Sequence, residues 1–148
     1  MQSAASPSTA TTPTARSWRV LVCDDIATIR HLLRINFELE GHLVDEAVDG
    51  TALLAQLLDP EQQRPDVVVL DVHMFPVDGW HTIKAIRAEP TLTDLPVVLL
   101  SAGVHGLDLA QAHAAGFDAV IAKPFDPDDL VALVSRVAAS GRVAPGPA

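Results

Sequence analysis

The sequence predicts an α/β fold, a doubly wound five-stranded parallel sheet covered by five helices. Two observations predict it. Short, continuous runs of aliphatic and β-branched residues recur along the chain, and amphipathic segments of helical length separate them. Strands that are buried on both faces of a parallel sheet carry such continuous apolar runs, and the crossovers between them are right-handed. The expected strand order is 2-1-3-4-5.

Five segments have the composition of strands. Four of them are continuous apolar runs, namely 19–23 (RVLVC), 67–70 (VVVL), 97–100 (VVLL) and 119–122 (AVIA). Such runs are typical of strands without a solvent-facing side. The remaining segment, 42–47 (HLVDEA), is half polar, which favours a position at the edge of the sheet.

Five segments between and after these strands have helical features. The predicted helices are 26–40, 49–58, 79–88, 107–115 and a segment that begins at Pro127. In the first of them, four apolar residues at helical spacing predict the face that packs on the sheet: Ile29, Leu32, Leu33 and Leu39. Pro60 stops the second helix and Gly116 stops the fourth. Asp126 is the expected N-cap of the last helix.

The 148 residues are enough for one domain. Residues 1–17 are rich in Ser, Thr, Ala and Pro, and they lack the apolar and basic regions of a signal peptide. Residues 140–148 are rich in Gly and Pro. We therefore expect a disordered N-terminal tail, a folded domain over 18–139 and a flexible C-terminal tail. Because 140–148 is too short for an output module, a stand-alone domain is expected.

The composition also excludes several classes of protein. The net charge of −9 disfavours binding to the phosphate backbone of a nucleic acid. The single cysteine, Cys23, excludes an internal disulfide, fits a cytoplasmic location and is expected to be a small core residue. No apolar run approaches the roughly 18 residues of a membrane span. Neither GxxxxGK[ST] nor GxGxxG is present, so these routes to nucleotide binding are excluded.

Polar residues that could bind a ligand or react follow four of the predicted strands. Asp24 and Asp25 follow the first strand, and Asp71 follows the third. Ser101 follows the fourth strand and Lys123 follows the fifth. Each has an ordinary alternative, as a helix cap, a turn residue or a solvated lysine. Because the carboxyl ends of parallel strands share one edge of the sheet, we instead expect all five side chains to converge there.

This set of residue types suits a metal ion and a phosphoryl group. Clustered carboxylates repel one another unless a cation lies among them. Hard oxygen ligands favour Mg²⁺, and a rim with no cysteine and little histidine disfavours zinc. A carboxylate can also attack phosphorus and form an aspartyl phosphate. Lys123 would then neutralise phosphoryl charge, and Ser101 would donate a hydrogen bond to a phosphoryl oxygen.

Over 18–137 the chain resembles the receiver domain of two-component response regulators, of the stand-alone type. The resemblance rests on the acidic pair 24–25, the segment DVHMFPVDG at 71–79, Ser101 with the small residue after it, and Lys123-Pro124-Phe125. It implies a flavodoxin-like fold and a switch that phosphorylates and dephosphorylates itself rather than a turnover enzyme. The implied partners are a histidine kinase or histidine phosphotransfer protein and a downstream protein.

The resemblance also implies a role for each site residue. Asp71 would accept the phosphoryl group. Asp25, Asp71 and the backbone carbonyl of His73 would bind Mg²⁺, and Asp24 would position the metal through water. Lys123 would pair first with Asp71 and then with the phosphoryl group.

Two features depart from the family pattern. Met74-Phe75 stands where the family usually has Met-Pro, and Val120 stands where it often has an aromatic switch residue. Signalling would then depend on Ser101 and backbone shifts. Two alternatives remain open. One is a receiver-like binding module that does not use phosphate. The other is a Mg²⁺-dependent phosphatase of the haloacid dehalogenase type, although Asp24-Asp25 lacks its D-x-D spacing.

Overall fold

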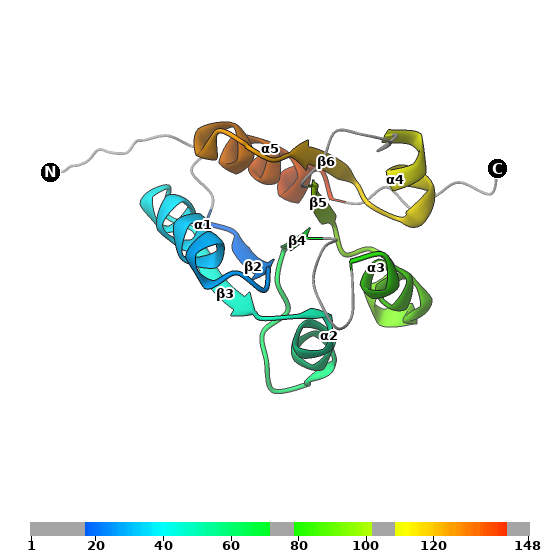
Figure 1. Cartoon of the computed structure of the whole chain (residues 1–148). Helices are drawn as coiled ribbons and strands as arrows, with labels where there is room; N and C mark the ends of the chain where they lie inside the picture. Colours follow the sequence, from blue (N-terminus) through cyan, green and yellow to red (C-terminus); the bar gives the residue numbers. More distant parts are fainter. Residues whose placement is uncertain (1–16, 72–78, 102–108, 142–148) are drawn as a thin grey trace, which may run out of the picture.

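The computed structural model describes residues 17–71, 79–101 and 109–141, and it contains one sheet of five parallel strands. The strands are β2 (Arg19–Cys23), β3 (Leu43–Ala47), β4 (Val67–Asp71), β5 (Val97–Ser101) and β6 (Ala119–Ala122). Their spatial order is β3-β2-β4-β5-β6, with β3 at an edge (Figure 1). This confirms the predicted strand order. It also places the half-polar segment at the edge, where the sequence predicted it.

Helices cover both faces of the sheet. They are α1 (Ala27–Leu39), α2 (Gly50–Leu58), α3 (Gly79–Ala88), α4 (Leu109–Ala115) and α5 (Pro127–Ser140). A short 3₁₀ turn, η1 (Pro90–Leu92), was not predicted. Helices α1 and α5 lie on one face, and α2, α3 and α4 lie on the other (Figure 1). Within the described ranges, no helix has the length and apolar character needed to cross a bilayer.

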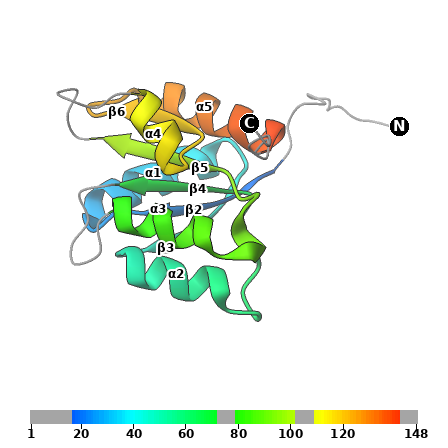
Figure 2. The ribbon, with the colours of Figure 1, turned by 90° about the vertical axis from the view of Figure 1, so that its right-hand side faces the viewer.

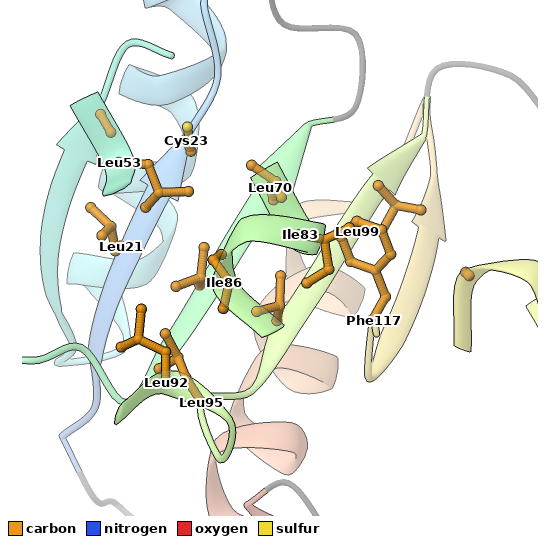
Figure 3. Close-up of a cluster of buried hydrophobic side chains, with 14 residues drawn as sticks. Leu21, Cys23, Leu53, Leu70, Ile83, Ile86, Leu92, Leu95, Leu99 and Phe117 are labelled. Carbon is orange, nitrogen blue, oxygen red and sulfur yellow. The ribbon is translucent and has the colours of Figure 1, made fainter. Parts of the chain in front are cut away.

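Each face of the sheet has its own apolar cluster, because successive side chains of a strand point to opposite faces. In β2, Leu21 and Cys23 join the cluster under α2, α3 and α4, whereas Val20 and Val22 join the cluster under α1 and α5. Figure 3 shows the first cluster, in which Leu70 and Leu99 of the sheet pack with Ile83 and Ile86 of α3 and with Phe117. This double burial is the reason for the continuous apolar runs in the sequence.

Cys23 is fully buried, as predicted for a core residue. Burial is the main cause that raises the pKa of its thiol, and the charge of Asp49 adds to it. The thiol donates to the Asp49 carbonyl at 3.3 Å. A protonated, enclosed thiol of this kind is unreactive.

The predicted buried face of α1 is wrong in part. Leu33 and Phe37 are fully buried, with Ile29 partly buried beside them. In contrast, Leu32 is 41% exposed and Leu39 is 76% exposed. The residues at 29, 33 and 37 form one stripe of the helix, and 32 and 39 belong to another. Both stripes have helical spacing, so periodicity alone could not select the one that faces the sheet.

The predicted helix ends at Gly116 and Asp126 are confirmed. Asp126 caps α5, and its side chain accepts a hydrogen bond from the backbone N–H of Asp128 at 2.8 Å. Gly116 follows α4 with a φ of +117°, which a residue with a Cβ rarely adopts. A Cβ at this position would also lie 2.7 Å from Arg87 Cγ.

Parts of several predictions lie outside the described residues. These parts are the tail segments 1–16 and 142–148, the loop that holds His73 and Met74-Phe75, and residues 107–108 of the fourth helix.

Candidate functional site

The sheet places four of the five predicted site residues at the carboxyl ends of its strands. Asp71 is the last residue of β4 and Ser101 is the last residue of β5, while Asp24 and Lys123 directly follow β2 and β6. All strands are parallel, so these ends lie at the same edge (Figure 2). Ser101 pairs with Ala122 in the sheet, and its carbonyl accepts a hydrogen bond from the Lys123 N–H at 2.6 Å. The backbone therefore brings Lys123 directly beside Ser101.

Lys123 forms an ion pair with Asp71. Its ammonium nitrogen Nζ lies 2.5 Å from Asp71 Oδ2 and 3.6 Å from Asp24 Oδ2. Asp71 is 2% exposed, and the Lys123 side chain is 19% exposed. One cation thus faces two buried carboxylates. The alternative of a solvated loop lysine is wrong.

Asp24 is fully buried, and only one of its carboxylate oxygens is hydrogen-bonded. Oδ1 accepts from the Ile26 N–H at 2.9 Å. Within the described part of the chain, Oδ2 has no hydrogen-bond partner. The pKa of Asp24 is raised to about 6, mainly by burial and also by the charge of Asp71. The Ile26 N–H and the charge of Lys123 act in the opposite direction.

An unsatisfied buried carboxylate oxygen beside a second carboxylate is an arrangement that a divalent cation would satisfy. The donors are oxygens of Asp24 and Asp71, which Mg²⁺ prefers over softer ligands. The residues present therefore fit a hard divalent ion.

Two other predicted ligands differ from Asp24 and Asp71, which are buried. Asp25 is exposed, and His73 lies outside the described residues. Among the side chains of 17–71, 79–101 and 109–141, no group of three or more His, Cys, Asp or Glu residues has the arrangement of a metal site. The structure thus brings together Asp24, Asp71, Ser101 and Lys123 but not a complete set of side-chain ligands.

The capping alternative for the acidic pair is also resolved by the structure. The N-cap of α1 is Ile26, which makes no side-chain capping bond. Asp24 instead accepts from the Ile26 N–H, two residues away, in a turn that precedes the helix. One oxygen of the Asp24 carboxylate, Oδ1, therefore stabilises the turn between β2 and α1, while Oδ2 remains available to the site.

Arg30, which belongs to none of the sequence motifs, holds the backbone of Asp24. Arg30 Nη1 donates to the Asp24 carbonyl at 2.7 Å, and its Nε donates to Glu46 Oε1 at 3.0 Å. Glu46 lies on the edge strand β3 and also pairs with Arg34 Nε at 2.6 Å. No local pattern reveals the pair of Arg30 with Glu46, because Glu46 is 16 residues away.

The region behind Ser101 is apolar. Val120 is partly buried against the cluster that contains Leu99 and Phe117. Trp80, in the first turn of α3, packs edge-on against Phe117 with ring centroids 5.6 Å apart. Trp80 therefore packs α3 against the turn that precedes β6. The peptide bond between Lys123 and Pro124 is cis.

The site could form a bond between the Asp71 carboxylate and a negatively charged group, whose charge Lys123 would neutralise. Asp71 presents an oxygen nucleophile, and Lys123 supplies a positive charge within contact distance of it. A cation held by Asp24 and Asp71 would add further positive charge. Such a rim stabilises charge on an incoming phosphoryl group.

Comparison with known proteins agrees with this arrangement. A family model described as the response regulator receiver domain matches residues 20–135. The DNA-binding dual master transcriptional regulator RpaA of Synechocystis is 35% identical over 119 residues, which cover 78% of this chain and 47% of RpaA. The transcriptional regulatory protein ResD of Bacillus subtilis is 34% identical, over 80% of this chain and 47% of ResD. The chain spans about half the length of these relatives.

Solved structures agree as well. The chemotaxis response regulator CheY4 of Vibrio cholerae has a TM-score of 0.73 and 28% identity, covering 82% of this chain and 99% of CheY4. The receiver domain of the Francisella response regulator 1452 has a TM-score of 0.75 and 29% identity, covering 84% of this chain and 98% of that domain. The Mn²⁺-bound form of response regulator Rcp1 shares the fold, with a TM-score of 0.69 at 21% identity over 81% of this chain and 91% of Rcp1.

Proposed function

Because the chain belongs to the response regulator receiver domain family, we propose that it is a phosphorylation switch with Asp71 as its phosphoacceptor. The phosphoryl donor is the phosphohistidine of a histidine kinase or of a histidine phosphotransfer protein. The observation that carries this proposal is the buried pair of Asp71 and Lys123, with 2.5 Å between Oδ2 and Nζ.

The reaction is a phosphoryl transfer between two side chains. A carboxylate oxygen of Asp71 attacks phosphorus, the bond between phosphorus and the histidine nitrogen breaks, and the nitrogen keeps the electron pair. Hydrolysis of the aspartyl phosphate later restores the carboxylate and releases inorganic phosphate. The domain is modified and restored in this cycle and is not a turnover enzyme.

The residues around Asp71 position and neutralise the phosphoryl group. Lys123 exchanges its bond to the Asp71 carboxylate for one to a phosphoryl oxygen, as its position beside both groups allows. Ser101, adjacent to Lys123 through the backbone, donates its hydroxyl to another phosphoryl oxygen.

Mg²⁺ fits the rim as the resident cofactor. Asp24, Asp25, Asp71 and the His73 carbonyl would hold it, with Asp24 acting through water. When bound, it supplies positive charge against the carboxylates and the phosphoryl oxygens. The related fold of Rcp1, described as Mn²⁺-bound, supports a divalent ion in such a domain.

Output passes to a downstream protein partner, or the phosphoryl group is relayed to a phosphotransfer protein. The phosphoryl group adds a charge of roughly −1.5 to −2, which biases the surface formed by α4, β6 and α5. Because Val120 replaces an aromatic residue, Ser101 and the backbone of β5 and β6 carry the signal. A cytoplasmic location fits the reduced, buried thiol of Cys23.

Acetyl phosphate with Mg²⁺ tests the phosphoacceptor. We expect intact-mass spectrometry to show a gain of one phosphoryl group, which is stable in acid, labile in base and absent from Asp71→Asn. Asp129→Asn, which changes an exposed aspartate of α5, is the matched control and should be modified like wild type.

Each other outcome has a definite meaning. Absence of any modification by acetyl phosphate or by a phosphorylated histidine donor would overturn the proposal in favour of a phosphate-independent binding module. Repeated turnover of an added phosphate ester would overturn it in favour of a phosphatase.

A further inference from the structure

A polar cavity of about 320 Å³ lies between α5 and the turn that follows α1. The two helices pack side by side on one face of the sheet (Figure 1). The described residues that line the cavity are Glu40, His42, Asp128, Val131, Ala132 and Ser135. They supply two carboxylates and a small apolar surface, but no lysine or arginine. No residue of the rim is among them, so the cavity is separate from the proposed phosphorylation site.

The lining of the cavity is negatively charged. Within the ranges that the structure describes, neither Glu40 nor Asp128 forms an ion pair. The ring of His42 adds no positive charge, because its Nδ1 accepts the Trp18 N–H at 3.1 Å and is therefore unprotonated. Carboxylates that line one cavity repel each other unless a cation lies between them. The cavity therefore favours a cationic occupant.

The described part of the chain begins beside this cavity. Ser17 Oγ donates to the Gly41 carbonyl at 2.8 Å, and the Trp18 N–H donates to the ring of His42. Gly41 and His42 directly follow Glu40 in the sequence. These two bonds hold residues 17 and 18 against the turn that carries the Glu40 carboxylate, so the residue before Ser17 is attached next to the cavity.

The residue before Ser17 is a cation. Residues 1–16 contain a single charged side chain, that of Arg16. Neighbouring Cα atoms are about 3.8 Å apart, and the long side chain of arginine extends the reach further. A guanidinium has five donors in a planar fork that matches carboxylates, and its apolar stem can pack on surfaces such as Val131 and Ala132. Arg16 therefore has the charge, the shape and the position that the cavity favours.

We propose that this cavity is the docking site of the chain's own residues 1–16, with the guanidinium of Arg16 between Glu40 and Asp128. The guanidinium donates to both carboxylates, and its stem covers the apolar surface of α5. Docking joins the segment that precedes β2 to α5 and limits the access of other proteins to that side of the helix. The proposal does not depend on phosphorylation of Asp71.

Trypsin tests the docking, because it cleaves after arginine only where the chain is free to enter its active site. The rate of cleavage after Arg16 in the full chain is followed by intact-mass spectrometry. Asp128→Asn should raise this rate about threefold, since the open form gains population when an ion pair is lost. Asp129→Asn is the matched control, because Asp129 is the other acidic residue in the first turn of α5 and does not line the cavity. It should leave the rate unchanged.

Two further measurements separate docking from a general loss of stability. Glu40→Gln should also raise the rate after Arg16 about threefold, because Glu40 is the other carboxylate of the cavity. Cleavage after Arg142, in the segment that follows α5, is the internal reference and should be equal in all variants. Added salt should raise the ratio of cleavage at Arg16 to cleavage at Arg142 in wild type, and much less in Glu40→Gln/Asp128→Asn.

Three results would overturn the proposal. In the first, the rate after Arg16 is the same in wild type, Glu40→Gln and Asp128→Asn, so the cavity accepts a cation from elsewhere. In the second, Asp128→Asn and Asp129→Asn raise the rate equally. In the third, the variants change only the rate after Arg142. None of these results bears on modification of Asp71, which the acetyl phosphate experiment tests separately.

Discussion

Arg87 donates two hydrogen bonds to the carbonyl of Gly116, from Nε at 2.9 Å and from Nη2 at 2.8 Å. The same guanidinium donates to the Leu95 carbonyl at 2.7 Å and pairs with Asp118 Oδ2 at 3.1 Å. Its side chain is only 14% exposed. Arg87 thereby fastens the end of α3 to the turn between α4 and β6 and to the start of β5.

This contact leads to a prediction about Gly116. Gly116→Ala should lower the free energy of unfolding by about 2–4 kcal/mol, because it forces a Cβ into positive φ and against Arg87 Cγ. Urea denaturation measures the change. Gly41→Ala is the control, since Gly41 also has positive φ, +88°, but nothing lies within 4 Å of its Cβ position. Equal losses in the two variants would contradict the steric contribution of Arg87.

Asp24→Asn should stabilise the metal-free protein. The change removes a buried charge whose Oδ2 has no hydrogen-bond partner among the described residues. The pKa of Asp24 is raised to about 6, mainly by burial, so ionisation of this group opposes folding at neutral pH. We expect a gain of about 1–3 kcal/mol in EDTA, measured by urea denaturation.

The same variant should lose the response to Mg²⁺. Wild type is expected to become more stable as Mg²⁺ is added, because the ion binds only the folded rim. Asp24→Asn should gain much less. A Mg²⁺ response that is the same in both proteins would show that Asp24 takes no part in holding the ion.

The buried, hydrogen-bonded ring of His42 predicts that the protein loses stability in mild acid. Its Nδ1 accepts a hydrogen bond from the Trp18 N–H at 3.1 Å, and its Nε2 lies 3.4 Å from Ser135 Oγ. An Nδ1 that accepts must be unprotonated, so the folded protein requires the neutral ring. Burial lowers the pKa of His42, although the charge of Glu40 opposes the shift.

Because the pKa of His42 is lowered in the folded protein, the free energy of unfolding falls as the pH falls. The unfolded chain binds a proton at His42 near the ordinary pKa of about 6.5, whereas the folded protein does so only at lower pH. The stabilisation is therefore complete above the unfolded pKa and is lost as the pH falls below it. His42→Gln should remove this part of the pH dependence. Parallel stability curves between pH 7.5 and about pH 5 would contradict it.

Arg30 should act as a positioning residue. Arg30→Met frees the Asp24 carbonyl from its 2.7 Å contact, and we expect Mg²⁺ affinity to fall about tenfold. Isothermal titration measures the affinity. Arg34→Met is the control, because Arg34 also pairs with Glu46 but does not hold the Asp24 carbonyl, which accepts from Arg30. Similar losses in both variants would assign the effect to Glu46 and β3 instead.

The sequence predicts the architecture and most of the rim for a simple reason. Parallel strands buried on both faces have a distinctive composition, and their carboxyl ends must share an edge. Asp24, Asp71, Ser101 and Lys123 could therefore be placed together from their positions after the strands. The predicted boundaries of β2 and β6 agree with the structure to the residue.

The features that the sequence did not predict depend on contacts that form only in the folded chain. Helix α1 has two stripes of helical period, and only packing against the sheet selects the one with Phe37. The bonds of Arg30 to Asp24 and of Arg87 to Gly116 also have no periodic pattern. A guanidinium with five donors can reach many partners, and only the folded backbone shows which carbonyls lie within range.

The rim residues stand at strand ends, directly after positions that fill the two apolar clusters. Leu70, for example, is fully enclosed, and the next residue is Asp71. Replacement of a rim side chain therefore removes no methyl group from the interior. A change to the acids, the hydroxyl or the ammonium therefore opens no apolar cavity, and its effect on stability comes from the buried charges of the rim.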